Sequence, residues 1–537
     1  MLPLRPALIA AFAATLMAAS WAATEPADAP TPPKPKVQQS TADHTKFKEL
    51  QQPFDSGPAV TRACLTCHTE ASKQIHTTQH WNWEYRNPQT NQLLGKRHVI
   101  NNFCTSVQSN LASCASCHIG YGMKDDKFDF ASQENVDCLV CHDTTGKYKK
   151  PGGFAGNPVV KDTEFPAGSG KIIRGIDLSE ISQKVGKSSR MTCGTACHFT
   201  GGGGDGVKHG DLDTSLEMPD KNLDVHMDAK GLNFTCATCH KTDGHQVPGS
   251  RYAPTAKDKD GAHLRGQADS TNPTTCPACH GQRPHKGEDK LNDHTAKVAC
   301  QTCHIPAFAR GDVPTKMSWD WSTAGKRGPN GKPLVITNDD GHPTYNGIKG
   351  TFELAENVKP EYVWFNGRVD YTLADTKVDK AQQPIYINKF QGSAADGQSL
   401  IWPVKLFRGK QAFDPVGGTL VVTHLAGADD TAYWTNLDWE KAVGAGMSTV
   451  NREFSGKVDF IETVSMWPIT HMVAPKDQAL RCGDCHSQGG RLDKVDGVYI
   501  PGRDRNTLVD GLGWLAAGGV LVVTLLHGGL RIVRRRR

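Results

Sequence analysis

The sequence predicts a mainly α-helical fold with much irregular structure, a partly β-stranded insertion at about residues 305–470, and one C-terminal transmembrane helix. Three observations predict it. Short cysteine motifs recur at close spacing through residues 45–304 and return at 482–486, which leaves room only for short helices and loops. The segment between them holds seven of the eleven tryptophans and several strand-like runs. A long uncharged apolar stretch lies near the C-terminus.

The N-terminus has the form of a secretory signal peptide over residues 1–23. Arg5 precedes a short apolar stretch that ends in small residues, so we expect cleavage near Ala22 or Ala23. An uncleaved anchor is the alternative. Residues 24–44 follow as a proline-rich linker of extended character. We therefore expect an exported chain.

Sixteen of the seventeen cysteines belong to seven C-x-x-C-H motifs and one C-x-x-x-C-H motif, which leaves only Cys104. Disulfides are the usual use of cysteine in an exported protein, and a lone C-x-x-C also suits zinc or a redox dithiol. A histidine directly after the second cysteine in all eight copies instead indicates covalently attached c-type haem. We therefore expect eight haem c groups. The attachment cysteines are Cys64, Cys67, Cys114, Cys117, Cys138, Cys141, Cys193, Cys197, Cys236, Cys239, Cys276, Cys279, Cys300, Cys303, Cys482 and Cys485.

Each motif histidine is expected to bind its iron on one side. These are His68, His118, His142, His198, His240, His280, His304 and His486. Twelve histidines remain once His44 is assigned to the linker and His527 to the anchor, so mostly bis-histidine iron is expected. Any one of the twelve is equally well a solvated surface residue. The candidate second ligands are His80, His226, His245, His263, His285, His294 and His471; the others are His76, His98, His209, His342 and His424.

Residues 45–500 are expected to form one multihaem domain, because the gaps between motifs are short enough for haem to pack against haem. Within the haem-free insertion, the runs PLVIT, EYVWFNGRVDY, PIYINKF and GGTLVVTHL predict strands. The closing run HMVAPKDQALRCGDCH is compatible with helix.

The C-terminal stretch predicts a membrane anchor at residues 509–533. The 20 residues from Gly511 to Leu530 carry no formal charge, and five arginines in the last seven positions mark the cytoplasmic side. A buried core helix is the alternative, and His527 suits either the membrane interface or a haem of a membrane partner. We expect a single pass that holds the body at the periplasmic face. These arginines equal the whole net charge of +5, so nucleic-acid binding is not supported.

The sequence resembles the octahaem tetrathionate reductase family of multihaem c-type cytochromes. The resemblance rests on the eight motifs in this order, on NNFC around Cys104, on CHFTGGGGDGVKHGDLD and on MWPITHMVAPKDQALRCGDCH. It covers roughly residues 45–495. The extra residue in the motif at Cys193 and the C-terminal helix depart from the pattern.

The resemblance implies that the second haem, on His118, is the catalytic one. It further implies that Lys208 replaces the histidine on the far side of that iron, with Asp205 and Cys104 nearby as catalytic residues. A lysine must be neutral to bind iron, and the glycines before Lys208 allow close approach to a porphyrin. Taken alone, Lys208 is equally well a solvated residue, GGGGDG an anion nest or a Ca²⁺ turn, and Cys104 a small buried one.

The implied function is a membrane-anchored reductase that passes electrons from a quinol-linked donor, such as a b-type cytochrome or quinol dehydrogenase, to a small inorganic substrate. Tetrathionate is the first expected substrate, and nitrite or hydroxylamine the second. A non-catalytic electron-transfer conduit and an oxidase like hydroxylamine oxidoreductase are the rival interpretations. A homo-oligomer is compatible with the sequence.

Overall fold

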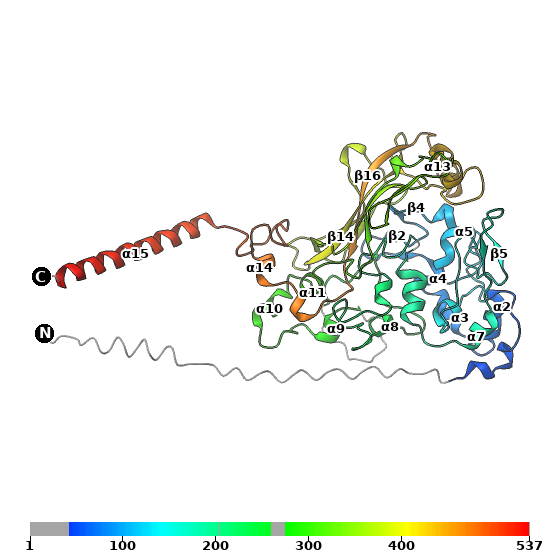
Figure 1. The fold of residues 1–537 in the computed structure, drawn as a ribbon, viewed down its shortest axis with the longest axis horizontal. Helices are drawn as coiled ribbons and strands as arrows, with labels where there is room; N and C mark the ends of the chain where they lie inside the picture. Colours follow the sequence, from blue (N-terminus) through cyan, green and yellow to red (C-terminus); the bar gives the residue numbers. More distant parts are fainter. Residues whose placement is uncertain (1–41, 202, 259–273, 536–537) are drawn as a thin grey trace. The chain divides into compact units, whose positions relative to one another are not determined.

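The computed structural model describes residues 42–201, 203–258 and 274–535 (Figure 1). The predicted signal peptide, most of the predicted linker and the candidate ligand His263 lie outside these residues. The described body combines short helices, much irregular chain and one large sheet, which confirms the predicted fold class.

The haem-motif region is built from helices of one to three turns, because each motif must turn both cysteines and the histidine toward one porphyrin. Most motif helices end at the second cysteine or at the histidine. The α-helices of this region are α2 (Gly57–Leu65), α3 (Ala71–His76), α4 (Gln79–Asn82), α5 (Leu111–Cys114), α6 (Leu139–His142), α7 (Leu178–Gln183), α8 (Cys236–Cys239), α9 (Pro277–His280), α10 (Asp289–His294), α11 (Cys300–His304) and α14 (Cys482–Cys485).

Single 3₁₀ turns and two-residue strand pairs join these helices. The 3₁₀ turns are η1 (His44–Lys46), η2 (Lys48–Leu50), η3 (Gln108–Asn110), η4 (Ala115–Cys117), η6 (Thr214–Leu216), η7 (Trp321–Thr323), η8 (Lys380–Gln382) and η9 (Lys476–Gln478). The strand pairs are β1 (Tyr85–Arg86) with β2 (Leu93–Leu94), β3 (Ile100–Asn101) with β4 (Thr105–Ser106), and β5 (Thr163–Glu164) with β6 (Ile172–Ile173).

The C-x-x-x-C-H motif forms a π-helix, η5 (Met191–His198). A π-helical turn holds more residues than an α-helical turn, so it absorbs an inserted residue without changing the direction of the chain. The extra residue of this motif is therefore accommodated locally, and Cys193, Cys197 and His198 stay within one continuous helical segment.

The haem-free insertion forms a mixed ten-stranded sheet, larger than its strand-like runs indicate. The central strands β14 (Leu400–Asp414) and β16 (Asp459–Pro468) pair along ten residue positions, and Figure 1 shows them side by side. The other strands are β7 (Thr315–Asp320), β8 (Val335–Thr337), β9 (Pro343–Asn346), β10 (Gly350–Ala355), β11 (Glu361–Phe365), β12 (Val369–Tyr371), β13 (Ile385–Phe390) and β15 (Thr419–Leu420). Helices α12 (Tyr433–Asn436) and α13 (Trp439–Thr449) precede β16.

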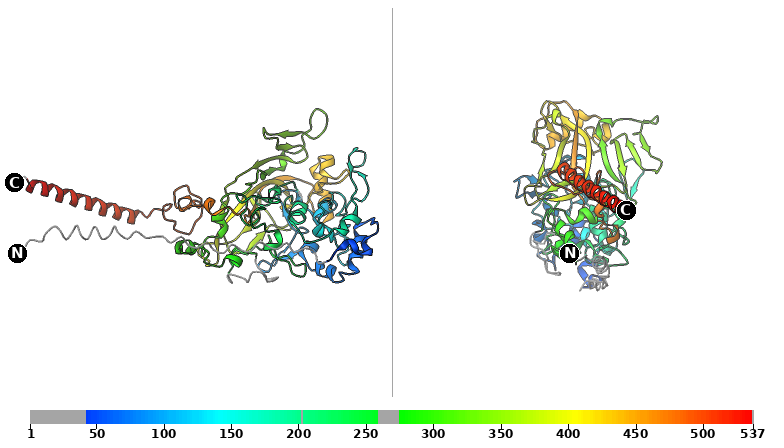
Figure 2. Two further views of the ribbon diagram at one scale, coloured as in Figure 1. Left: turned by 60° about the horizontal axis from the view of Figure 1, so that its bottom comes forward. Right: turned by 90° about the vertical axis from the view of Figure 1, so that its left-hand side faces the viewer.

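The sheet packs against the haem-motif region and supplies most of the apolar core. The carbonyl oxygen of Ile401 on β14 accepts two hydrogen bonds from the motif region. The backbone N–H of Ala299 donates one at 3.0 Å, and the hydroxyl of Thr302 donates the other at 2.8 Å. The strands gather on one side of the motif helices in both views of Figure 2. The sheet of the insertion therefore packs against one side of the motif region.

The closing run is mostly irregular, so the helical expectation for residues 471–500 is wrong apart from η9 and α14. Met472 has a φ of 64°, which helical geometry excludes, and the backbone N–H of His471 binds Asp211 instead of continuing a helix.

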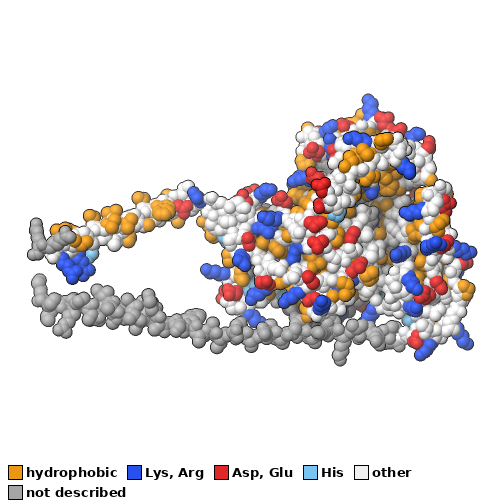
Figure 3. All heavy atoms as spheres, viewed as in Figure 1, with side chains coloured by type: hydrophobic (Ala, Val, Ile, Leu, Met, Phe, Trp, Pro, Cys, Tyr) orange, Lys and Arg blue, Asp and Glu red, His pale blue; other side chains and the backbone are white. Residues whose placement is uncertain are grey.

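Helix α15 (Thr507–Arg535) is long and apolar enough to cross a membrane, and none of its apolar stretch is buried. Figure 3 shows apolar side chains along its length and basic ones toward its C-terminal end.

Candidate haem sites and catalytic centre

Six motif histidines each face a second histidine from elsewhere in the chain. Their ring centroids are 5.9–6.4 Å apart. The pairs are His68 with His44, His198 with His80, His240 with His471, His280 with His226, His304 with His285, and His486 with His294. Four of these pairs join residues more than 50 positions apart, so the fold brings them together.

The separation fits an iron between the two rings. Metal–nitrogen bonds of imidazole are about 2 Å long, so two nitrogens on opposite sides of one metal lie about 4 Å apart. Adding about 1 Å from each nitrogen to its ring centre gives about 6 Å, which matches the six pairs. These residues therefore fit haem c with two histidine ligands.

Hydrogen bonds orient several of these rings. Nδ1 of His142, His240 and His486 donates to the carbonyls of Gly186, Pro248 and Pro501 at 2.8–2.9 Å. Such a bond fixes the ring and leaves Nε2 for a metal.

The remaining second-ligand candidate, His245, lies close to His142. Burial lowers the pKa of His245, and the charges of His142 and His68 lower it further. Its Nδ1 lies 2.7 Å from the side-chain oxygen of Gln74. His245 stays the predicted partner of His142.

His44 was missed by the sequence reasoning, which assigned it to the linker. His44 is the first residue of η1, and its ring centroid lies 6.3 Å from that of His68. The proline-rich residues before His44 indicated a linker, so His44 was not considered as a ligand. No fixed spacing relates His44 to the motif at Cys64.

The five histidines that were not candidate second ligands have other surroundings. His98 binds Glu84 at 2.9 Å, His424 binds Asp429 at 3.1 Å, His76 stacks on Trp81, His342 lies between β8 and β9, and His209 packs on Trp467.

His118 is unlike the other motif histidines because it is completely buried and surrounded by aromatic rings. Trp81, Trp83 and Phe128 lie 4.9–5.4 Å from it, centroid to centroid. Nε2 lies 2.6 Å from the carbonyl oxygen of Trp81, whereas Nδ1 is buried without a hydrogen-bond partner. The ring of His118 is thus held the opposite way round from those of His142, His240 and His486, with Nδ1 and not Nε2 left for a metal.

The NNFC run forms the β3–β4 turn that positions Cys104. The side chain of Asn101 accepts hydrogen bonds from the backbone N–H groups of Phe103 and Cys104, both at 2.9 Å. Asn102 is buried and bonds to strands β14 and β16, and Phe103 stacks on Phe407 at 3.8 Å. Cys104 is half-buried at the end of this rigid turn.

Lys208 lies at the end of the glycine loop and is half-buried. Its Nζ donates to the carbonyl of Gly201 at 2.6 Å. Gly201 has a φ of +53°, and a Cβ there would lie 3.0 Å from the Lys208 side chain, so glycine is needed for both the turn and the close approach. The side chain of Lys208 therefore folds back over the start of its own glycine loop.

Burial and nearby ionisable groups change the pKa of the Lys208 amine. Burial lowers its pKa; Cys104 and Cys114 raise it, whereas Lys96 and Arg251 lower it. The net lowering favours the neutral amine, which is the form that binds iron. Nζ of Lys208 lies 5.9 Å from the ring centroid of Phe103, the residue before Cys104, and the role of Lys208 at the second motif stays a prediction.

Lys405 fixes the loop to the sheet and was not foreseen. It is fully buried on β14, and its Nζ donates to the carbonyls of Val207 and Lys208 at 3.2 and 3.0 Å. Within the described residues, Lys96, Arg251, Lys405 and Lys208 form no ion pair with Asp or Glu.

Asp205 lies on the same loop, but its carboxylate accepts hydrogen bonds from the backbone and the hydroxyl of Thr214. These contacts favour a loop-closing role over the expected catalytic one. In the described ranges, no group of three or more His, Cys, Asp or Glu side chains is arranged to hold a metal ion, so the expected Ca²⁺ turn gains no support.

Contacts between cysteines of different motifs reveal the order of the haem sites in space. Thiols close enough to share a hydrogen bond pair Cys64 with Cys138, Cys117 with Cys197, Cys193 with Cys236, and Cys276 with Cys300. Longer-range electrostatic interactions pair Cys141 with Cys193, Cys239 with Cys279, and Cys303 with Cys485. The motifs therefore follow one another in the order 1, 3, 4, 5, 6, 7, 8, and the second motif branches from the fourth.

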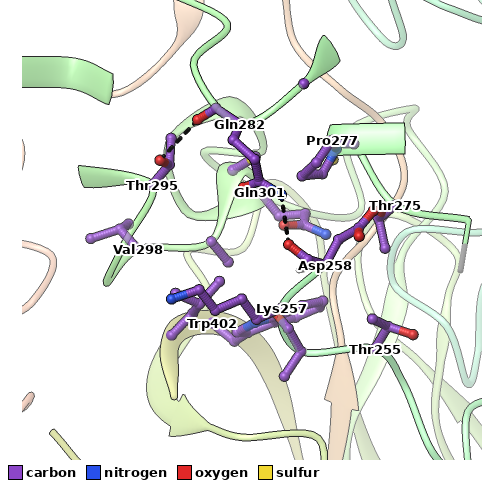
Figure 4. A pocket seen from close by; sticks show the side chains of 16 residues that line it. Thr255, Lys257, Asp258, Thr275, Pro277, Gln282, Thr295, Val298, Gln301 and Trp402 are labelled. Atoms are coloured by element: carbon purple, nitrogen blue, oxygen red, sulfur yellow. Dashed lines mark hydrogen bonds between the residues drawn. The ribbon is translucent and has the colours of Figure 1, made fainter. Parts of the chain in front are cut away.

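A cavity lies between the sixth and seventh motifs (Figure 4). Cys276 and Cys300 line it, together with Asp258, Gln282 and Trp402, whose indole bonds to the carbonyl of Ala256. A space beside attachment cysteines fits the edge of a porphyrin, and it is distinct from the Lys208 neighbourhood.

Comparisons with known proteins agree with this arrangement. Residues 63–143 match the family described as cytochrome c554 and c-prime, and residues 316–489 match bacterial cytochrome c. No curated protein matches the chain. The solved octaheme cytochrome c of Shewanella oneidensis is similar at 38% identity with a TM-score of 0.72, over 87% of this chain and 98% of that one. The chain belongs to the octahaem tetrathionate reductase family of multihaem c-type cytochromes.

Proposed function

We propose that the protein is a membrane-anchored octahaem reductase that reduces a small oxidised sulfur or nitrogen compound at the haem held by Cys114, Cys117 and His118. One observation carries the proposal: six motif histidines face a second histidine at 5.9–6.4 Å, whereas the ring neighbours of His118 among the described residues are tryptophans and phenylalanines and include no histidine. Lys208, which the resemblance assigns to this iron, has its Nζ 5.9 Å from the ring centroid of Phe103, the residue before Cys104. Haem supplies electrons and an iron site for substrate. In this proposal, the substrate would take the place of the Lys208 amine at the second haem.

Lys208 serves in this proposal as a displaceable second ligand. Its loop is glycine-rich, and its amine has an alternative partner in the Gly201 carbonyl at 2.6 Å. The Gly201 carbonyl would therefore supply a hydrogen-bond acceptor for the amine whenever the amine did not hold the haem. Asp205 keeps the loop closed through Thr214 and is a positioning residue.

The charge of the site favours an anionic substrate. Lys96 and Arg251 carry no carboxylate partner among the described residues, so haem propionates and an anion are the partners that they would meet. Tetrathionate is a dianion and nitrite a monoanion, whereas hydroxylamine is neutral. This asymmetry favours tetrathionate or nitrite.

Cys104 suits tetrathionate best. Its thiolate attacks a central sulfur of ⁻O₃S–S–S–SO₃⁻, forms a Cys–S–S–SO₃⁻ bond and releases one thiosulfate. Two electrons then break the new S–S bond, which releases the second thiosulfate and regenerates the thiolate. The sum is tetrathionate plus two electrons to two thiosulfates, without net proton uptake.

The order of the sites suggests the direction of electron flow. The eighth motif is joined to the seventh through Cys485 and Cys303, and α15 follows it in the chain. We infer that electrons arrive at the eighth haem from a quinol-linked donor in the membrane and pass through the seventh to the fourth. In this scheme α15 spans the membrane with its arginines in the cytoplasm and the body in the periplasm.

The test is a steady-state assay of the purified full-length protein with a reduced dye and tetrathionate, nitrite or hydroxylamine. Cys104→Ser should abolish tetrathionate turnover and retain most nitrite turnover, because only the first reaction needs a thiolate. Cys104→Ala, which also lacks the thiol, is the matched control for the hydroxyl that serine introduces. Absence of turnover with all three substrates would reduce the protein to an electron conduit.

A further inference from the structure

A buried ion pair lies behind the second haem site. Lys150 and Asp137 are 2.8 Å apart, and their side chains are 2% and 0% exposed. The hydroxyls of Tyr121 and Tyr148 donate to the two oxygens of Asp137 at 2.8 and 2.9 Å. All donors and acceptors are thus satisfied away from water.

The pair is oriented along the line between two motifs. Lys150 also donates to the carbonyl of His118, the histidine of the second motif, so its positive end lies at that residue. Asp137 directly precedes Cys138 of the third motif, and its Oδ1 accepts the backbone N–H of Val140 at 3.1 Å. The negative end therefore lies at the third motif.

The fourth motif lies beside both of these sites: Sγ of Cys197 is 3.9 Å from the carbonyl oxygen of Cys117, and η5 of the fourth motif packs against α6 of the third. An electron that reaches the fourth haem can therefore continue to the second or to the third. Within the described residues, the other motif that the third adjoins is the first, through Cys138 and Cys64. The pathway divides at this point.

We propose that the Asp137–Lys150 pair is a fixed dipole that directs electrons at this division to the second haem. This inference rests on the proposed function of that haem. A positive charge near an acceptor stabilises the added electron and a negative charge opposes it, and both effects are strong in a buried, low-dielectric setting. A buried ion pair contributes little to stability compared with apolar residues of similar size, so stability alone does not account for it.

The test is a potentiometric titration of the holoprotein followed by electron paramagnetic resonance and visible spectra. Signals are assigned beforehand by Lys208→Ala for the second haem and His245→Ala for the third. Lys150→Met should lower the potential of the second haem by at least 59 mV, a tenfold change in its share of electrons. Lys147→Met, an exposed lysine paired with Glu180, is the control and should change neither potential.

Lys150→Met leaves a buried carboxylate unpaired and can prevent folding. The double variant Asp137→Asn with Lys150→Met removes both charges, and it should narrow the gap between the two potentials. A change of less than twofold in the share of electrons held by each of the two haems, measured in either folded variant, would overturn the inference. If Lys208→Ala changes no signal, the proposed function fails instead, and the two outcomes remain distinct.

Discussion

Lys405→Met tests whether the sheet holds the lysine loop in place. Lys405 is completely buried, and burial holds its pKa well below its ordinary value. Its two hydrogen bonds to the loop carbonyls of Val207 and Lys208 are 3.2 and 3.0 Å long. Methionine keeps the length and the apolar stem of the side chain but donates no hydrogen bond.

The magnitude follows from these two bonds. A buried hydrogen bond contributes about 1 kcal/mol, so losing both weakens the closed loop by about 2 kcal/mol. Because 1.36 kcal/mol corresponds to a factor of ten, the open loop becomes about 30-fold more populated. Removal of a buried amine offsets part of the loss, so we expect the global free energy of unfolding to change by less than about 2 kcal/mol.

The assay is cyanide binding to the oxidised holoprotein, followed by visible spectra. Lys405→Met should raise the apparent cyanide affinity about 30-fold. Arg408→Met, an exposed change three residues along β14, should leave it unchanged. An affinity within threefold of wild type for Lys405→Met would show that the sheet does not hold the loop, and this part of the reasoning would be refuted.

Three further predictions concern the haem count, the anchor and the missed ligand. The intact mass of the mature protein should show eight haem additions; seven would mean that Cys193 and Cys197 attach none. Deletion of residues 507–537 should release an active soluble protein, and continued sedimentation with membranes would exclude α15 as the anchor. His44→Ala should convert one haem from a six-coordinate to a five-coordinate spectrum, whereas His76→Ala should not; identical spectra of both variants would exclude His44 as a ligand.

The sequence predicted the parts of the site that are local. A cysteine motif and its histidine lie within six residues, so their chemistry is readable without a fold. Partners such as His240 and His471 are 231 positions apart and meet only through tertiary structure. His44 illustrates the same limit, because its partner His68 lies across α2 and its own neighbours suggested a linker.

The sheet was recognised in outline, but its central strand was not. Strand β14 is buried on nearly every residue, so it lacks the alternation that marks a half-buried strand, and it contains Pro403 and Lys405. A lysine is rarely fully buried, so a pattern-based reading assigns Lys405 to solvent. Its role depends on the loop carbonyls that the fold brings to it.

The central claim is that Lys208 binds the iron held at His118. The most direct measurement is electron paramagnetic resonance of oxidised holoprotein for wild type, Lys208→Ala and Lys208→His, beside their steady-state rates. We expect Lys208→Ala to replace one low-spin signal with that of an open iron that binds cyanide, and Lys208→His to convert it to a bis-histidine signal with loss of turnover. Unchanged haem signals and unchanged turnover in Lys208→Ala would contradict the account.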